Sequence, residues 1–283
     1  GNTPGKVGSG LAAIKREVLP DDTYVYKING TSHYFKNTSP QRLYVKWKGL
    51  EIDAKLPCEM YCIGSHGNSL YFTTMKKVYK ASFSPSALIT VSFVRDKVEG
   101  EVFDKLGLSS RVRNGKRYVY RVSDNPDRDG ILINISEREL KRLRLIGIHR
   151  GKAIFVSTTA SKYRPSAYKV GENVIVIEAS LHALNAYICD SSPFIYLLIW
   201  AKDIHTLDTR SMRFLPPLNI GDVDEITYIA GVHKGRMTVE GLIDHDFYAV
   251  TAQLPIGHFL NATPDVDLEI AHIIEDKIKS ISQ

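Results

Sequence analysis

Arg117-Tyr-Val-Tyr-Arg-Val122, which follows the Asn114-Gly115 pair, is the stretch that decides the fold. Its residues alternate between apolar and polar, as those of a half-buried β-strand do. The Asn-Gly pair supplies the positive φ angles that a tight hairpin turn needs. The same pattern recurs at residues 23–30, 43–47 and 70–72. The sequence therefore predicts a scaffold built from antiparallel hairpins.

We expect this scaffold to be an α+β protein that is rich in β-structure, with a curved sheet and a few helices. Residues 1–10 are rich in Gly, Pro and Ser and are predicted to be flexible. A β-rich N-terminal part over residues 11–122 and an α+β C-terminal part over residues 123–283 would follow, divided at the loop of residues 123–130. The alternative is that the two parts form one continuous domain.

Helices are expected at four places, namely residues 11–19, 136–145, 179–187 and, as an amphipathic C-terminal helix, 267–281. Pro20 would end the first of them. Ser136-Glu-Arg-Glu139 has the form of a capping box, which opens the second helix, and Gly147 would end it. Further hairpin turns are indicated at residues 149–151, 171–173 and 233–235.

The run from Phe194 to Trp200 carries no charge. A short apolar run of this kind is typical of a central strand, so Leu197 and Ile199 should be buried. The run continues to Ala201, which makes it the longest apolar stretch, yet it is too short to span a bilayer. We therefore expect no membrane as a partner.

Composition indicates a globular protein, with a hydrophobic fraction of 43% and a mean hydropathy of −0.15. Basic residues outnumber acidic ones by 37 to 31, which gives a net charge of +6 and favours polyanionic partners. Three cysteines cannot all pair within one chain, so a reducing, cytoplasmic location is expected. The alternative is a glycosylated protein, because four sequons occur, at Asn29, Asn37, Asn134 and Asn261.

The loop Asn125-x-Asp127-x-Asp129-Gly130 spaces its oxygen ligands as the opening of a calcium-binding loop does. The twelfth position of that pattern is Ser136, which cannot supply a bidentate carboxylate. We therefore interpret the loop as a solvated turn between two strands, made of residues that favour turns.

Residues 51–55 would form a strand with Asp53 and Lys55 on one face. Asp53-x-Lys55, with Pro20-Asp21-Asp22 upstream, resembles the Pro-Asp…(Asp/Glu)-x-Lys motif of the restriction-endonuclease-like nuclease superfamily. The resemblance implies a Mg²⁺-dependent phosphodiester hydrolase. In it, Asp22 or Asp21 and Asp53 would be the metal ligands, with Lys55 as the catalytic lysine.

Other interpretations of this pattern stay open. The short motif also occurs at residues 139–141 and 275–277, and a charged outer strand face explains Asp53 and Lys55 equally well. A second placement would use Glu178, Asp190 and Lys202, in which a tryptophan stands where the second carboxylate belongs.

Basic and aromatic residues are interleaved along the predicted hairpins, which is the chemistry of a nucleic-acid groove. The candidate contacts are Lys46, Arg111, Arg113, Lys116, Arg117, Arg121, Lys141, Arg142 and Arg144. The alternative is that tyrosine simply forms strands well and that the lysines solvate them.

Two functions follow from the sequence. The first is a nucleic-acid-binding protein, in its sharper form a Mg²⁺-dependent DNA or RNA endonuclease. The second is a non-enzymatic structural or assembly protein, for instance of a virus or phage, whose hairpins form subunit contacts or a homo-oligomer. A cleft with convergent carboxylates would favour the first, and long exposed sheet edges the second.

Overall fold

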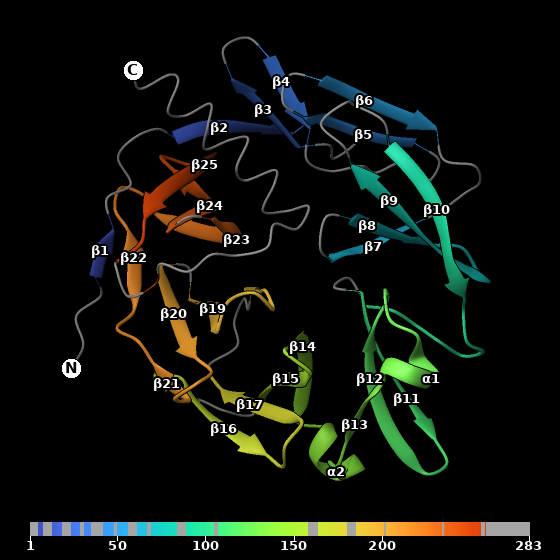
Figure 1. Cartoon of the computed structure of the whole chain (residues 1–283). Helices are drawn as coiled ribbons and strands as arrows, with labels where there is room; N and C mark the ends of the chain where they lie inside the picture. The colour runs from blue at the N-terminus through green and yellow to red at the C-terminus, as the bar shows by residue number, and fades with distance from the viewer. Residues whose placement is uncertain are drawn as a thin grey trace. The chain divides into compact units, whose positions relative to one another are not determined.

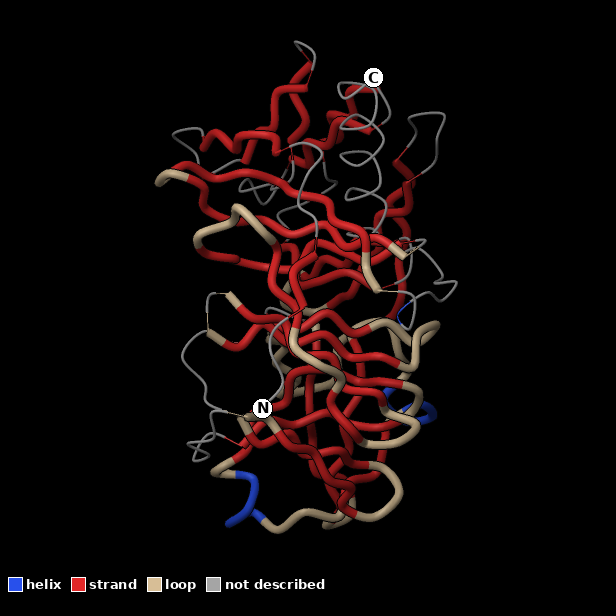
Figure 2. Tube along the Cα trace, turned by 90° about the vertical axis from the view of Figure 1, so that its left-hand side faces the viewer, coloured by secondary structure: helices blue, strands red, loops and turns tan. Residues whose placement is uncertain are grey.

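The computed structural model describes residues 5–7, 13–18, 24–28, 31–34, 42–47, 50–55, 61–66, 69–83, 89–104, 107–157, 164–179, 185–200, 202–233, 235–255 and 258. The chain divides into two compact units. The first comprises residues 1–5 and 98–219, and the second residues 6–97 and 220–283. Strands dominate the described residues of both (Figures 1 and 2).

The described residues of the first unit form three sheets. The strands of each sheet are named in the order in which they lie side by side. One sheet holds β11 (Leu108–Arg113), β12 (Lys116–Arg121) and β13 (Ile131–Ile133). The next holds β14 (Leu143–His149), β15 (Lys152–Ser157), β17 (Val174–Glu178) and β16 (Ser166–Val170). The third holds β20 (Asp203–Asp208), β19 (Phe194–Ile199) and β18 (Asn185–Ile188), with β21 (Arg213–Phe214) beside β20. Its spatial order continues from β20 to β22 (Leu218–Ile220) and β1 (Gly5–Val7), and each of these two strands spans a point at which the chain passes from one unit to the other.

Strands β15 and β17 form the centre of the first unit. They run parallel, whereas the neighbouring pairs β14/β15 and β16/β17 are antiparallel. Alternate residues of the two strands enter different cores. Ile154, Val156, Ile175 and Ile177 pack with β19 residues such as Leu197, while Ala153, Phe155, Val174 and Val176 pack with β12 and β13 residues such as Val119 and Ile133. Burial on both faces explains why these strands read as continuous apolar runs.

The second unit contains three more sheets. A four-stranded antiparallel sheet holds β7 (Tyr61–His66), β8 (Ser69–Thr73), β9 (Lys77–Phe83) and β10 (Ile89–Asp96). A six-stranded sheet holds, in spatial order, β23 (Glu225–His233), β24 (Arg236–Ile243), β25 (Asp246–Gln253), β2 (Ala13–Val18), β3 (Tyr24–Ile28) and β4 (Thr31–Tyr34). Among the described strands, β5 (Arg42–Trp47) and β6 (Leu50–Lys55) form a separate two-stranded sheet.

The expected α+β class is wrong, because the described residues are all-β apart from two helices of one turn each, α1 (Pro126–Asp129) and α2 (Glu137–Leu140). The single curved sheet is wrong as well. Several small, mainly antiparallel sheets take its place. None of the helices in the described residues has the length and apolar character needed to cross a membrane.

Three of the predicted helices are corrected in detail. Residues 13–18 form β2 instead of a helix, and residues 185–188, at the end of the third predicted helix, form β18. The capped helix ends at Leu140, and β14 begins at Leu143. Gly147 lies inside β14 next to a bulge, where a Cβ atom would stand only 2.2 Å from Ile188 Cδ1. The predicted helix over residues 267–281 lies outside the described residues.

The predicted hairpins and the buried strand are confirmed. Asn114 and Gly115 have φ angles of 52° and 74° and join β11 to β12. Arg150 and Gly151 join β14 to β15 in the same way, with φ angles of 49° and 76°. All six residues of β19 are buried, including Leu197 and Ile199. The Asn-Gly and Arg-Gly turns match the twist of the strands they join.

Candidate binding groove

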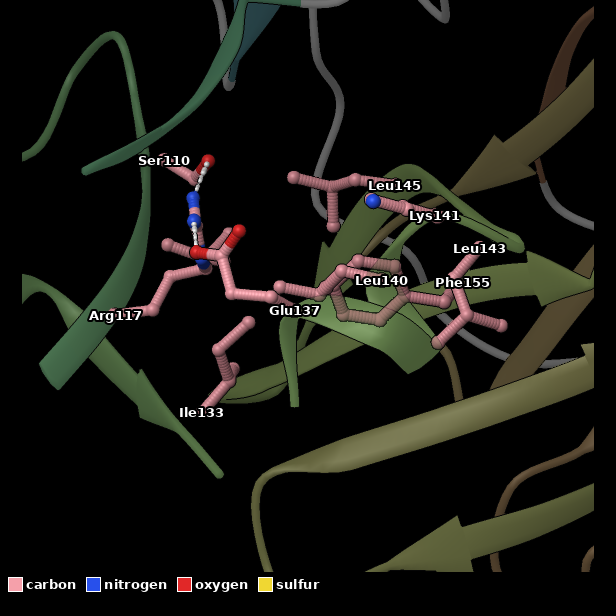
Figure 3. A pocket seen from close by; sticks show the side chains of 10 residues that line it. Ser110, Arg117, Ile133, Glu137, Leu140, Lys141, Leu143, Leu145 and Phe155 are labelled. Carbon is pink, nitrogen blue, oxygen red and sulfur yellow. Dashed lines mark hydrogen bonds and ion pairs between the residues drawn. The ribbon is translucent and has the colours of Figure 1, made fainter. Parts of the chain in front are cut away.

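A partly open groove of about 310 Å³ lies in the first unit, where the β11–β13 sheet meets α2 and the β14/β15 hairpin (Figure 3). Its volume is at the lower end of the range for ligand sites. Apolar side chains supply most of its lining, namely Val119, Ile133, Leu140, Leu143, Leu145 and Phe155. Polar groups from Ser110, Arg117, Glu137 and Lys141 complete it.

The floor of the groove is part of the protein core. Val119, Ile133 and Phe155 are buried and belong to the core that the β11–β13 sheet shares with β15 and β17. Leu140, Leu143 and Leu145 are half-buried and pack against the same core. Because these side chains are held by close packing, the floor is preformed.

One wall of the groove is the single turn of α2. The Oγ of Ser136 accepts a hydrogen bond from the Glu139 N–H at 3.2 Å, so the predicted capping interaction is confirmed. Glu137, Leu140 and Lys141 are three and four positions apart and therefore share one face of this turn. That face lines the groove.

An ion pair crosses the groove from β12 to α2. The Nη2 of Arg117 donates to Glu137 Oε1 at 2.6 Å, and its Nη1 donates to Ser110 Oγ at 3.4 Å (Figure 3). The Glu137 side chain is 78% exposed, so solvent screens the pair and its contribution to stability is small. Its main effect is to fix both side chains at the mouth, where Lys141 is also exposed.

Four of the six arginines that the sequence assigned to nucleic-acid binding are engaged by carboxylates, namely Arg111, Arg113, Arg117 and Arg121. Asp127 binds both Arg111 and Arg113, and Arg113 also lies over the Tyr118 ring at 4.7 Å. The hydrogen bond from Arg111, followed by that from Arg113, holds the pKa of Asp127 below its usual range. These two guanidinium groups therefore serve to fix α1 against the hairpin.

Arg121 is engaged in a second, partly buried junction. Its Nη2 lies 3.0 Å from Asp190 and donates to the Ile148 carbonyl at 2.6 Å. Asp190 also accepts from the Arg150 N–H at 2.8 Å, and its backbone carbonyl accepts from Arg150 Nε at 2.8 Å. Burial opposes ionisation of Asp190, but these donors outweigh it and keep its pKa low. The junction ties β12 to two turns of the neighbouring sheets.

The remaining candidate cations are differently placed. Lys116, Lys141, Arg142 and Arg144 are exposed. Lys141 and Arg142 form the short link between α2 and β14, and Arg144 lies in β14. Lys46 lies in β5 opposite Glu51, and for it only the strand is described. The pairing of Arg111, Arg113, Arg117 and Arg121 could not be read from the sequence, because each partner carboxylate lies at least 14 positions away.

The nuclease motif stays a prediction. Asp53 and Lys55 lie in β6, opposite Tyr44 and Arg42 of β5, as expected of a strand. Asp22 lies outside the described residues, so the convergence of the three is untested. In the residues that were described, no group of three or more His, Cys, Asp or Glu side chains could hold a metal ion. Mg²⁺ therefore stays a prediction too.

The residues of two other candidate sites, the calcium-like loop and the alternative nuclease placement, lie in structural elements and contacts. Asn125 caps α1 by accepting from the Asp127 N–H at 3.0 Å, and Asp129 is paired with Arg128. In the alternative nuclease placement, Glu178 ends a strand instead of lying in a helix. Asp190 belongs to the arginine junction described above.

No protein-family model matches the chain, and no curated protein is similar to it in sequence. Among solved structures, PorZ, an essential bacterial surface component of the type-IX secretion system of Porphyromonas gingivalis, matches 93% of this chain with 9% identity and a TM-score of 0.45. This chain covers 39% of the PorZ chain. Two structures of Chaetomium thermophilum Sqt1 match 79% and 88% of this chain, and 65% and 72% of their own, with identities of 12% and 13% and TM-scores of 0.36 and 0.34. The function is therefore inferred from the groove.

Proposed function

We propose that this protein is a non-enzymatic binding and assembly module, and that the groove beside α2 takes an apolar segment of another protein. The observation that carries the proposal is the combination of a preformed apolar floor with three half-buried leucines at its edges, Leu140, Leu143 and Leu145. Covering each leucine would contribute on the order of 1 kcal/mol.

The polar groups of the groove support binding over catalysis. The Arg117 guanidinium and the Glu137 carboxylate satisfy each other at 2.6 Å. Each of the two groups therefore already has a partner within the groove. The pair and Lys141 are instead suited to the polar rim that surrounds an apolar contact.

Methyl-resolved NMR tests this proposal. We expect short amphipathic peptides to bind and to shift the methyl signals of Leu143 and Leu145, with Leu132 unshifted. Leu132 lies in β13 next to the groove residue Ile133, but its side chain is 38% exposed and outside the groove. Leu143→Ser should abolish binding, and Leu132→Ser should leave it unchanged. Shifts that are spread evenly over the protein would refute the groove as the binding site.

Nucleic-acid binding is a second candidate function, favoured by the exposed cations Lys141, Arg142 and Arg144 on one short segment. If these cations contact phosphates, affinity for an oligonucleotide should fall steeply as salt rises, because each contact releases counterions. Replacing all three with alanine should flatten that dependence. Undetectable binding at low salt would remove this candidate.

A further inference from the structure

We infer that the segment bound in the groove is acidic, with an apolar side chain flanked by Asp or Glu. This inference rests on the proposed function and adds the chemistry of the partner. The charged side chains that line the groove are Arg117 and Lys141, against Glu137. Positive charge therefore exceeds negative charge in the lining.

The ion pair between Arg117 and Glu137 cancels one positive and one negative charge of the lining. Glu137 is held by Arg117 at 2.6 Å, so its negative charge is compensated inside the groove. Lys141, the residue directly after α2, lines the same groove and is exposed. The cation that faces an incoming segment is thus Lys141, placed directly beside the leucines.

The geometry assigns a role to each part of the partner. An apolar side chain would lie on the floor formed by Val119, Ile133 and Phe155. A carboxylate one or two positions away would meet the Lys141 ammonium at the mouth. A basic segment would bring like charges together at the rim, which costs binding energy and slows association.

Fluorescence anisotropy with three matched peptides tests the inference on the intact protein. The first carries Leu flanked by Glu, the second carries the same Leu flanked by Lys, and the third carries Ser flanked by Glu. We expect the first to bind at least about tenfold more tightly than either of the others. The preference over the Lys peptide should shrink as salt rises.

Two charge-reversal variants test whether Lys141 causes the preference for the Leu-Glu peptide. Lys141→Glu should weaken the Leu-Glu peptide by about tenfold and strengthen the Leu-Lys peptide. Lys169→Glu, at an exposed site on β16 outside the groove, changes the net charge equally and should alter neither affinity. Both substitutions are at exposed side chains, so unfolding midpoints should match the wild type.

The outcomes of these binding experiments distinguish the acidic-partner inference from the proposed function on which it rests. If both Leu peptides bind equally well, the acidic partner is refuted and the binding groove stands. If the Ser-Glu peptide binds as tightly as the Leu-Glu peptide, the surface is a general polyanion site and the nucleic-acid candidate is favoured. Equal weakening by Lys141→Glu and Lys169→Glu would also refute the inference. If no peptide binds, both it and the proposed function fail.

Discussion

Strand β17 and strand β12 belong to neighbouring sheets of one unit, yet they carry opposite kinds of surface. Four of the five residues of β17 are buried, whereas in β12 only Val119 and Tyr120 are buried, Lys116 is exposed, and Arg117 and Arg121 are half-buried. A strand that is buried on both faces leaves no place for charge. The less buried β11–β13 sheet can therefore carry cations that β17 cannot, and the groove lies where this sheet meets α2 and the β14/β15 hairpin.

The largest change in unfolding free energy is expected from a side-chain truncation in a fully buried strand. Leu197→Ala in β19 should lower the free energy of unfolding by about 2–5 kcal/mol, because the packed neighbours cannot close the cavity. Val112→Ala in β11, where the side chain is 54% exposed, should cost less than about 0.5 kcal/mol. Urea denaturation measures both. Equal costs would mean that the buried and one-sided strands do not differ in this way.

The arginine junction should give the next largest effect. Asp190→Ala leaves the 17%-exposed Arg121 side chain without its carboxylate and removes the acceptor of the Arg150 N–H. We expect a loss of about 1–3 kcal/mol in unfolding free energy. Asp127→Ala, at a carboxylate that is 70% exposed, is the matched comparison and should cost clearly less, because solvent screens its ion pairs. The reverse order would contradict the structural role given to Asp190.

The helix cap is a smaller test. Ser136→Ala removes the acceptor of the Glu139 N–H and should cost about 1 kcal/mol. Ser136→Asp should restore most of that stability, since aspartate caps equally well. Thermal unfolding compares the three proteins. Because α2 forms a wall of the groove, Ser136→Ala should also weaken the binding of the Leu-Glu peptide.

The smallest effect concerns pH. His149 is buried, its Nε2 donates to the Ser192 carbonyl at 2.6 Å, and burial lowers its pKa. A lowered folded-state pKa means that the unfolded chain takes up the proton first. The stability from this group is thus complete above the unfolded value of about 6.5 and is lost as pH falls below it. Denaturation midpoints between about pH 7 and about pH 5 should fall more steeply for the wild type than for His149→Gln; equal slopes would contradict it.

Local signals predicted the parts of the fold that depend on few residues. Asn114-Gly115 needs only its own φ angles to form a turn, and the run Phe194–Ile199 needs only to be free of charge. The capping box fixed where α2 begins. Where α2 ends was not predictable, because the residues from Leu143 onward pair with β15 as a strand, and this pairing is not visible in the local helical pattern. The predicted helix at residues 11–19 failed for a similar reason, since β2 pairs with β25 near the other end of the chain.

The site was predicted less well than the fold. The arginine cluster in the sequence lies on the β11–β13 sheet, but charge alone cannot distinguish a cation that is available to a ligand from one that already binds Asp127 or Asp190. The groove depends on Val119, Phe155 and Leu143 meeting across three elements. No spacing pattern in the sequence predicts that these three side chains come together.

The two-faced packing of β17 has a consequence for how this protein can evolve. Val174 and Val176 enter one core, while Ile175 and Ile177 enter the other. Exchanges among Val, Ile and Leu keep both cores filled and should be common among its descendants. A single inserted or deleted residue within the strand would instead exchange the two sets and disturb both cores at once. Among natural variants, the apolar residues of β17 should therefore exchange freely with one another, while the length of the strand stays fixed.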